Sequence, residues 1–227
     1  MHMILQKLAE GNTAEIFQLD NNRILKLFKQ GYSKESMLRE YHNHRIVSRL
    51  LDNVPKLYET VEEDERFGYI MELLNGINLA ELLLNEQNFA GAMEQFVSLH
   101  KAWNKEAPSG LISYKDWMMS MIVNKQQEPE LLEKIRELPE GTILCHGDFH
   151  PYNIIVTEEN KLIVIDFANV CRGTKKYDIA RSYFLMEEAG AKQLAEIYLE
   201  KMQVNFVEIK EFYEVIADVR KYETREA

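Results

Sequence analysis

The chain has 227 residues, of which 46% are hydrophobic and 28% are charged, a composition typical of a globular protein and not of a disordered one. Its formal net charge of −10 and its lack of a Lys/Arg block argue against a nucleic-acid partner. No stretch approaches the roughly 18 to 20 apolar residues that span a membrane. We therefore expect no nucleic-acid or membrane partner, although a local basic pocket could still bind an anion.

The cysteines give a weak indication of the cellular compartment. Cys145 and Cys171 lie outside any CxxC or zinc-type spacing. The start of the chain, "MHMILQKLAEGN", shows no signal-peptide pattern. We expect a reducing, cytoplasmic environment and two buried, unreactive thiols. The sequence leaves the oligomeric state open.

The first third of the chain alternates β-type runs with turn residues. The runs "MILQKLAE", "AEIFQLD" and "RILKLFK" predict strands, and Asn21-Asn22 predicts a hairpin turn before the third. Ser33 is a plausible N-cap for a helix over "SKESMLREYHNHRIVSRLL". "KLYETVEE" and "RFGYIMEL" predict a second hairpin. The order β-β-β-α-β-β indicates a small twisted sheet with one helix.

After Asn75-Gly76 the pattern becomes helical. Helices are predicted over "NLAELLLNEQ", "FAGAMEQFVSLHKAWNK", "YKDWMMSMIVNKQ" and "PELLEKIREL", and again from Tyr177 onward with a break at Gly190. Between them we expect an embedded hairpin at 143–167, with "ILC" and "NIIV" as a strand pair and a further turn near Asn160. The prediction is an α+β fold, with a β-rich lobe at 1–74 and a larger helical lobe at 75–227.

The densest polar cluster of the sequence lies in "ILCHGDFHPYNIIV", residues 143–156. Loops between buried strands are where a fold displays reactive side chains on a rigid support. Asp148 and Asn153 stand in this loop, and Asp166 ends the later run "LIVID". Such hard oxygen atoms suit Mg²⁺, which binds a few protein oxygens together with substrate phosphates. Asp148 would then be free to accept a proton from an attacking hydroxyl.

"HGDFHPYN" followed by "IDF" resembles the aminoglycoside phosphotransferase and choline kinase superfamily. These proteins are small-molecule kinases with a protein-kinase-like fold of two lobes. The resemblance implies transfer of the γ-phosphoryl of ATP or GTP to a hydroxyl. It implies that Asp148 positions or deprotonates that hydroxyl, and that Asn153 and Asp166 hold Mg²⁺.

The same resemblance implies a lysine that steadies the phosphates and a glutamate that orients it. Lys26 in "RILKLFK" matches the lysine better than Lys29, which stands beside the strand's end. Glu40 in "LREY" is preferred as its partner. Glu35 remains the alternative, although a carboxylate in a first helical turn also serves the helix dipole.

Further nucleotide contacts follow from the resemblance. In "EGNTAEIF", Gly11 and Asn12 would belong to the phosphate-covering loop, and Asn12 and Thr13 would offer backbone N–H groups to phosphates. In "YIMELLNG", Met71 would line the base pocket, and backbone groups near Glu72 and Leu73 would meet the adenine edge.

Other residues near the motif are expected to have structural roles. The resemblance implies that Arg172-Gly173, and then Asp178 at a helix start, brace the catalytic loop. His146 is expected to bond the loop backbone, and His150 to shape the loop. Trp117 is expected in the helical core. A second interpretation has Trp117 or Asp116 facing a cationic acceptor.

Several motifs differ from those of protein kinases, and these differences limit the class of acceptor. The phosphate loop has one glycine, the metal motif reads Asp166-Phe167-Ala168, and no A-P-E segment follows. Together these features argue against a eukaryotic-type protein kinase. The resemblance then implies a small hydroxylated acceptor such as an aminoglycoside, choline or a related amino alcohol, with sugars and amino-acid-like acceptors left open. A protein Ser/Thr kinase and a non-catalytic nucleotide-binding module remain as alternatives.

Overall fold

The computed structural model describes residues 6–122 and 127–223. The chain divides into two compact units. The first unit holds Met1–Asn78 and Ile154–Ala168, and the second holds Leu79–Asn153 and Asn169–Ala227. Residues 154–168, which the sequence predicted within a lobe at 75–227, thus group with the N-terminal sheet.

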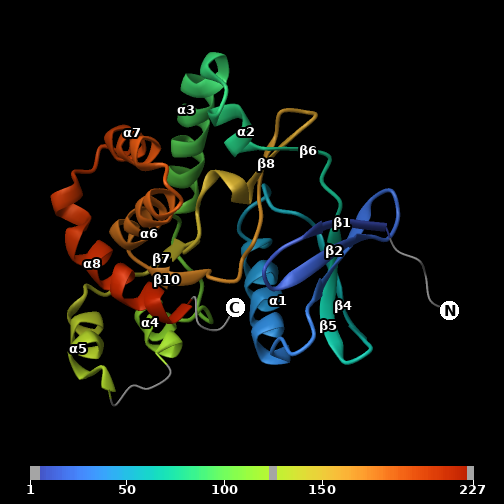
Figure 1. The fold of residues 1–227 in the computed structure, drawn as a ribbon, viewed down its shortest axis with the longest axis horizontal. Helices are drawn as coiled ribbons and strands as arrows, with labels where there is room; N and C mark the ends of the chain where they lie inside the picture. The colour runs from blue at the N-terminus through green and yellow to red at the C-terminus, as the bar shows by residue number, and fades with distance from the viewer. Residues whose placement is uncertain (1–5, 123–126, 224–227) are drawn as a thin grey trace. The chain divides into compact units, whose positions relative to one another are not determined.

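The first unit is built on a five-stranded antiparallel sheet with the order β1-β2-β3-β5-β4 (Figure 1). Its elements are β1 (Gln6–Glu10), β2 (Ala14–Gln18), β3 (Arg23–Phe28), α1 (Lys34–Val47), β4 (Leu57–Glu63) and β5 (Arg66–Glu72). The predicted order β-β-β-α-β-β and both hairpins are confirmed. Asp20 Oδ1 accepts the Asn22 N–H at 2.8 Å in the β2–β3 turn, and Ser33 caps α1 through Ser36 N–H.

Alternating side chains of β3 serve two faces of this sheet. Leu25 and Leu27 pack with Ile70 on one face. Phe28 packs with Tyr69 and with Met37 of α1 on the other. Because Lys26 lies two residues before Phe28, its side chain points to the face that α1 covers. A lysine is thereby placed in an apolar layer, where it needs a buried partner.

A small second sheet completes the first unit. It has the order β6-β8-β9 and consists of β6 (Gly76–Asn78), β8 (Ile154–Thr157) and β9 (Leu162–Val164). Asn160 adopts φ 58° in the β8–β9 turn, as the predicted turn requires. The Val164 N–H donates to Asn53 O at 2.9 Å. This bond and the β6–β8 pairing explain why 154–168 groups with the N-terminal residues.

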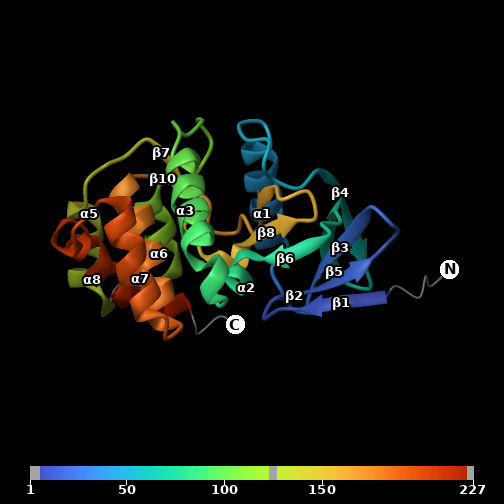
Figure 2. The same cartoon turned by 90° about the horizontal axis from the view of Figure 1, so that it is seen from above.

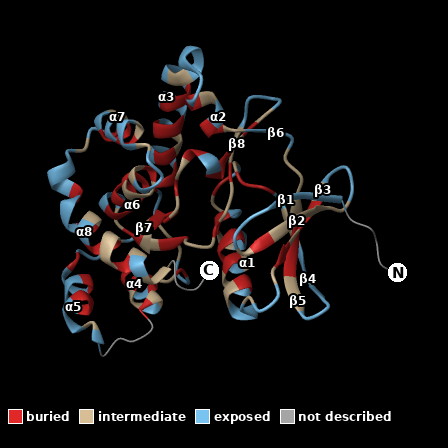
Figure 3. Ribbon diagram, in the orientation of Figure 1, coloured by how far each residue is buried: buried red, intermediate tan, exposed pale blue. Residues whose placement is uncertain are grey.

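The second unit is helical, with one short strand pair (Figure 2). Its helices are α2 (Leu79–Leu83), α3 (Glu86–Trp103), α4 (Tyr114–Met121), α5 (Pro129–Glu137), α6 (Lys175–Glu188), α7 (Lys192–Met202) and α8 (Phe206–Glu223). The predicted helices are confirmed, although the predicted end of the third helical run, at 123–126, lies outside the described residues. Gly190 separates α6 from α7 with φ 80°. Buried stripes on these helices face one another (Figure 3). No helix in the described part of the chain is both long and apolar enough to cross a membrane.

The prediction of a strand pair between "ILC" and "NIIV" is wrong. Strand β7 (Ile143–Cys145) pairs with β10 (Cys171–Gly173), with Cys145 opposite Cys171. Strand β8 pairs instead with β6 and β9. A 3₁₀ turn at Pro151–Asn153 intervenes between β7 and β8 and redirects the chain. The two β-type runs are real strands, but their partners come from elsewhere in the sequence.

Gly68 offers a test of the N-terminal sheet. A Cβ at Gly68 would lie 2.4 Å from the Lys26 carbonyl oxygen. We expect Gly68→Ala to lower the free energy of unfolding by about 1–3 kcal/mol, the usual range for overpacking, as measured by urea denaturation. In the control Gly91→Ala, the exposed helical glycine has open space around its Cβ, so stability should rise by roughly 0.5–1 kcal/mol. Equal stability of the Gly68 variant and the parent would contradict the close strand approach.

Candidate active site

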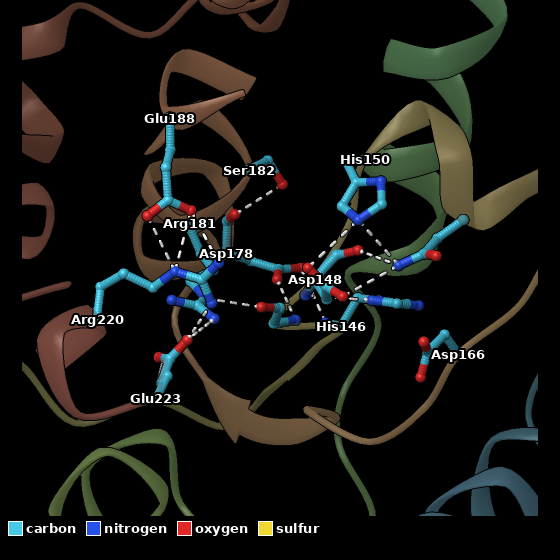
Figure 4. Close-up of polar contacts among 12 residues, drawn as sticks. His146, Asp148, His150, Asp166, Asp178, Arg181, Ser182, Glu188, Arg220 and Glu223 are labelled. Atoms are coloured by element: carbon cyan, nitrogen blue, oxygen red, sulfur yellow. Dashed lines mark hydrogen bonds and ion pairs between the residues drawn. The ribbon is translucent and has the colours of Figure 1, made fainter. Parts of the chain in front are cut away.

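The polar loop after β7 folds around Asp148 (Figure 4). Asn153, at the end of the 3₁₀ turn, donates from Nδ2 to the Asp148 carbonyl at 3.0 Å and to Asp148 Oδ2 at 3.1 Å. Asn153 Nδ2 also lies 3.2 Å from His150 Nε2. These contacts all use the amide nitrogen of Asn153 and not Oδ1, its side-chain oxygen. The structure therefore brings together Asp148 and Asn153, as the sequence predicted.

Asp148 is a stable carboxylate. Its side chain is 23% exposed, and His150 Nε2 lies 3.5 Å from Oδ1. Burial alone would raise the pKa of Asp148, but the interaction with His150 and the nearby Arg181 and His146 lower this pKa to about 2. The group is consequently ionised at neutral pH and can accept a hydrogen bond or a proton.

A second, fully buried carboxylate fixes the backbone of the loop. Asp178, in the first turn of α6, accepts the Gly147 N–H at 2.9 Å and the His146 N–H at 3.2 Å. His100 Nε2 and Asn104 Nδ2 contact the same carboxylate at 2.9 and 3.0 Å. The expected bracing role of Asp178 is confirmed. His100 and Asn104 were not predicted, since each lies more than 70 residues from Asp178 in the sequence.

His146 and Gly147, which precede Asp148, both shape the loop. His146 is fully buried, and its Nδ1 accepts the Asp148 N–H at 3.3 Å. Gly147 has φ 73°, and a Cβ there would lie 2.5 Å from the Asn169 carbonyl oxygen. Glycine is thus required both by the left-handed backbone and by the close approach.

In the first unit, Lys26 forms a buried ion pair with Glu40 of α1. The Nζ–Oε1 distance is 2.6 Å, and the Tyr69 hydroxyl donates to the same carboxylate oxygen at 2.6 Å. Glu40 is 2% exposed, whereas the alternative, Glu35, is exposed in the first turn of α1. Lys29 instead pairs with Glu10 at the surface. The buried lysine–glutamate pair is therefore Lys26 with Glu40, and neither Lys29 nor Glu35 takes part in it.

Asp166 is the second carboxylate near Lys26, with Oδ1 3.8 Å from Nζ. Burial opposes the charge of Lys26, but the carboxylates of Asp166 and Glu40 outweigh it and raise the pKa of Lys26 well above its ordinary value. The lysine therefore stays protonated and presents a cation beside Asp166.

The backbone of Asp166 is held in an uncommon conformation. Asp166 has φ 67°, which few residues other than glycine adopt. The next residue, Phe167, is fixed by α1, because Asn43 Nδ2 donates to its carbonyl at 3.0 Å and the His44 ring lies 4.5 Å from its ring. The side chain of Asp166 stays 39% exposed. Such strain is commonly found at functional sites.

The expected hinge contacts are only partly available. The Glu72 N–H donates to Lys56 O at 2.9 Å, and the Leu73 N–H donates to Asn22 O at 2.8 Å. An adenine edge would therefore have to use carbonyl oxygens at these residues or a donor beyond Leu73. Met71 packs against the apolar cluster that contains Tyr69.

Gly11 and Asn12 form the turn between β1 and β2 and are exposed. The Gly11 N–H donates to Ala14 O at 2.8 Å within this turn. That N–H is therefore committed to the turn itself, which leaves the predicted phosphate donors as the N–H groups of Asn12 and Thr13.

Side-chain oxygen atoms of the kind that Mg²⁺ binds are present in each of the two units. Among the described residues no group of three or more His, Cys, Asp and Glu side chains is gathered for a metal. Asp166 and Asn153 each present an oxygen that suits Mg²⁺. Because Mg²⁺ usually keeps waters and substrate phosphates as ligands, a full protein cage is not needed.

Trp117 lies in the core of the second unit, as its main interpretation predicted. It is 2% exposed, and the Arg181 guanidinium lies 5.2 Å from its ring centroid. Asp116 is at the surface and hydrogen-bonds to Ser113. Neither observation supports the second interpretation, in which Trp117 or Asp116 faces a cationic acceptor.

The comparisons with known proteins agree with this class of fold and site. Residues 114–201 match the model of the phosphotransferase enzyme family. That segment contains Asp148, Asn153 and Asp166. Over these residues the match agrees with the resemblance that the sequence motifs indicated. No curated protein sequence matches the chain.

Solved structures show the same fold. Aminoglycoside-3'-phosphotransferase of type VIII superposes with a TM-score of 0.66 at 15% identity, over 96% of this chain and 92% of that one. Choline kinase LicA from Streptococcus pneumoniae gives 0.65 at 15% identity, over 99% and 86%. A streptomycin–ATP complex of APH(2")-IIa gives 0.61 at 19% identity, over 91% and 79%. At these identities the likeness establishes the α+β, kinase-like fold.

The Lys26–Glu40 pair gives a direct stability test. Lys26→Met leaves the Glu40 carboxylate buried without its cation, so we expect a loss of about 3–5 kcal/mol in the free energy of unfolding measured by urea denaturation. The matched control is Lys29→Met on the same segment. Lys29 pairs at the surface, and its loss should change stability by no more than about 1 kcal/mol. Similar effects of the two substitutions would show that the pair is not effectively buried.

Proposed function

We propose that this protein transfers the γ-phosphoryl group of ATP or GTP to a hydroxyl of a small molecule. The observation that carries the proposal is the family match over residues 114–201, because that segment contains the loop residue Asp148 and the two oxygen ligands Asn153 and Asp166. The geometry around each of these residues supports it independently. The donor nucleotide and the acceptor class are part of the proposal.

On the donor side, Lys26 would bind the α- and β-phosphates. Its ammonium is held on the α1 side of the sheet by Glu40 and stays protonated beside Asp166. A cation fixed in this way neutralises phosphate charge without having to reorganise during the reaction. Glu40 would orient Lys26, and the Tyr69 hydroxyl would orient Glu40.

On the acceptor side, Asp148 would accept a hydrogen bond from the attacking hydroxyl and take its proton. The low pKa of Asp148 makes it a weak base, so orientation of the hydroxyl would be its larger contribution. Asn153 fixes one carboxylate oxygen at 3.1 Å, and Asp178 fixes the backbone before it. Most of the rate acceleration would then come from positioning and charge neutralisation.

Asn153, through Oδ1, and Asp166, through its carboxylate, would hold Mg²⁺. When bound, Mg²⁺ would supply positive charge that offsets the charge developing on the phosphates. The role of the protein is to keep both oxygens on a fixed backbone. Asn153 is fixed by the hydrogen bonds that its Nδ2 donates to Asp148. Asp166 is fixed because Asn43 donates a hydrogen bond to the carbonyl of the next residue, Phe167.

The acceptor class is inferred from charge and from neighbours. Structures of the same fold were solved with streptomycin, kanamycin and hygromycin B, and one neighbour is a choline kinase. The chain carries a net charge of −10. An acidic protein favours a cationic acceptor, so we place amino-group-bearing alcohols, aminoglycosides and choline among them, ahead of neutral sugars.

Replacement of Asp148 tests the reaction. With γ-labelled ATP or GTP, Mg²⁺ and a panel of aminoglycosides, amino alcohols and sugars, the parent protein should label one acceptor class. Asp148→Asn should reduce that transfer by roughly 10²- to 10⁴-fold, the usual contribution of a general base, with nucleotide binding by calorimetry largely unchanged.

The matched control is Asp218→Asn, which changes a carboxylate on α8 that pairs with Lys221 at the surface. Its transfer rate should equal that of the parent. Undiminished transfer by Asp148→Asn would contradict the mechanism. Label appearing in added protein and in no small molecule would favour a protein kinase, and nucleotide binding without any transfer would favour a non-catalytic module.

A further inference from the structure

An ion pair and a hydrogen bond in the second unit, both made by Arg181, connect the end of α8 to the loop that carries Asp148 (Figure 4). Arg181 Nε donates to the Gly147 carbonyl oxygen at 2.9 Å. Arg181 Nη2 donates to Glu223 Oε2 at 2.8 Å, where α8 ends. The loop and Glu223 are about 75 residues apart in sequence, and Arg181 is the side chain that touches both.

Gly147, the residue before Asp148, is thereby held through both its N–H and its carbonyl by one helix. The N–H of Gly147 donates to Asp178, and the carbonyl of Gly147 accepts from Arg181, which stands three residues further along α6. Residues three apart on a helix lie on the same face. Because the Gly147 carbonyl belongs to the Gly147–Asp148 peptide, fixing its direction also fixes the start of Asp148.

Arg181 is a buried charge that depends on its partners. Its side chain is 2% exposed, and Glu223 is 9% exposed. The Trp117 ring lies 5.2 Å from the guanidinium carbon and gives the cation an aromatic face. Arg220 donates to the same Glu223 oxygen at 2.8 Å and also contacts Glu188. Without Glu223, the buried arginine would lose its hydrogen-bonded counter-charge and would move toward water, away from Gly147.

We propose that Arg181, oriented by Glu223, is a positioning residue for Asp148, so that the last turn of α8 is part of the active-site machinery. This rests on the proposed phosphotransferase function for its catalytic consequence. The bracing of the loop itself is independent of that function. Arginine suits this task because its planar fork serves two acceptors in fixed directions, which a lysine cannot do.

The test compares Arg181→Lys and Glu223→Gln with a control that also joins α6 to α8. Tyr213→Phe removes the hydrogen bond from the Tyr213 hydroxyl of α8 to Glu187 of α6, which measures 2.6 Å and does not touch the loop. Two readouts are taken at a temperature where all variants are folded: amide hydrogen exchange of the peptide 146–150, and kcat and KM for the labelled nucleotide.

We expect faster exchange in the loop peptide for Arg181→Lys and Glu223→Gln. We also expect a kcat lower by roughly 10- to 100-fold with little change in the KM for nucleotide, since a small misplacement of a reacting group has this effect. The double variant should be no slower than Arg181→Lys alone, because Glu223 acts through Arg181. Tyr213→Phe should match the parent in both readouts.

Loop exchange equal to that of the parent, or a fall in kcat no larger than that of Tyr213→Phe, would overturn the proposal. A double variant with additive losses would show that Glu223 does not act through Arg181. If the parent protein transfers no phosphate, the proposed function fails, and the exchange measurement alone then decides whether Arg181 positions the loop.

Discussion

In the second unit, the path of the loop that carries Asp148 depends on one buried carboxylate, that of Asp178. Asp178 has no contact with solvent, and an ionised carboxyl in that position is costly unless donors surround it. The backbone N–H groups of His146 and Gly147 and the side chains of His100 and Asn104 supply those donors. Each donor is fixed in return. Satisfying Asp178 therefore determines the path of the loop that displays Asp148.

The first unit solves a similar problem with a buried cation. Lys26 lies in the apolar layer between the sheet and α1, where Glu40 neutralises it and Tyr69 completes the hydrogen bonds. The same helix holds the segment after β9 through Asn43. One helix thus sets both the lysine and the backbone of Asp166. In each unit, a buried charge is stable only when its hydrogen-bond and ion-pair partners surround it. Those partners also fix the polar groups that we propose to be functional.

Local sequence patterns predicted most elements, because strand alternation, turn residues and helix caps act over a few residues. The motif residues Asp148 and Asn153 and the pair Lys26–Glu40 could likewise be predicted, as family spacing encodes them. The pairing partners of the strands could not be predicted from the sequence. The pairing of β7 with β10, and of β8 with β6, depends on segments far apart in the chain. The same is true of Arg181 and Glu223, which are 42 residues apart and carry no local signal. Hydrogen bonding within the fold also removed the Glu72 and Leu73 N–H groups from the expected adenine contacts.

The central claim is that the protein binds a nucleoside triphosphate with Mg²⁺ as phosphoryl donor, and thermal unfolding of the unaltered protein tests it most directly. ATP and GTP are each added with Mg²⁺, and Mg²⁺ alone serves as the reference. A nucleotide at about 100 times its Kd should stabilise the folded state by about 2.7 kcal/mol, which raises Tm by several degrees. The account predicts such a rise with at least one nucleotide. An unchanged Tm with both, at millimolar concentrations, would contradict it.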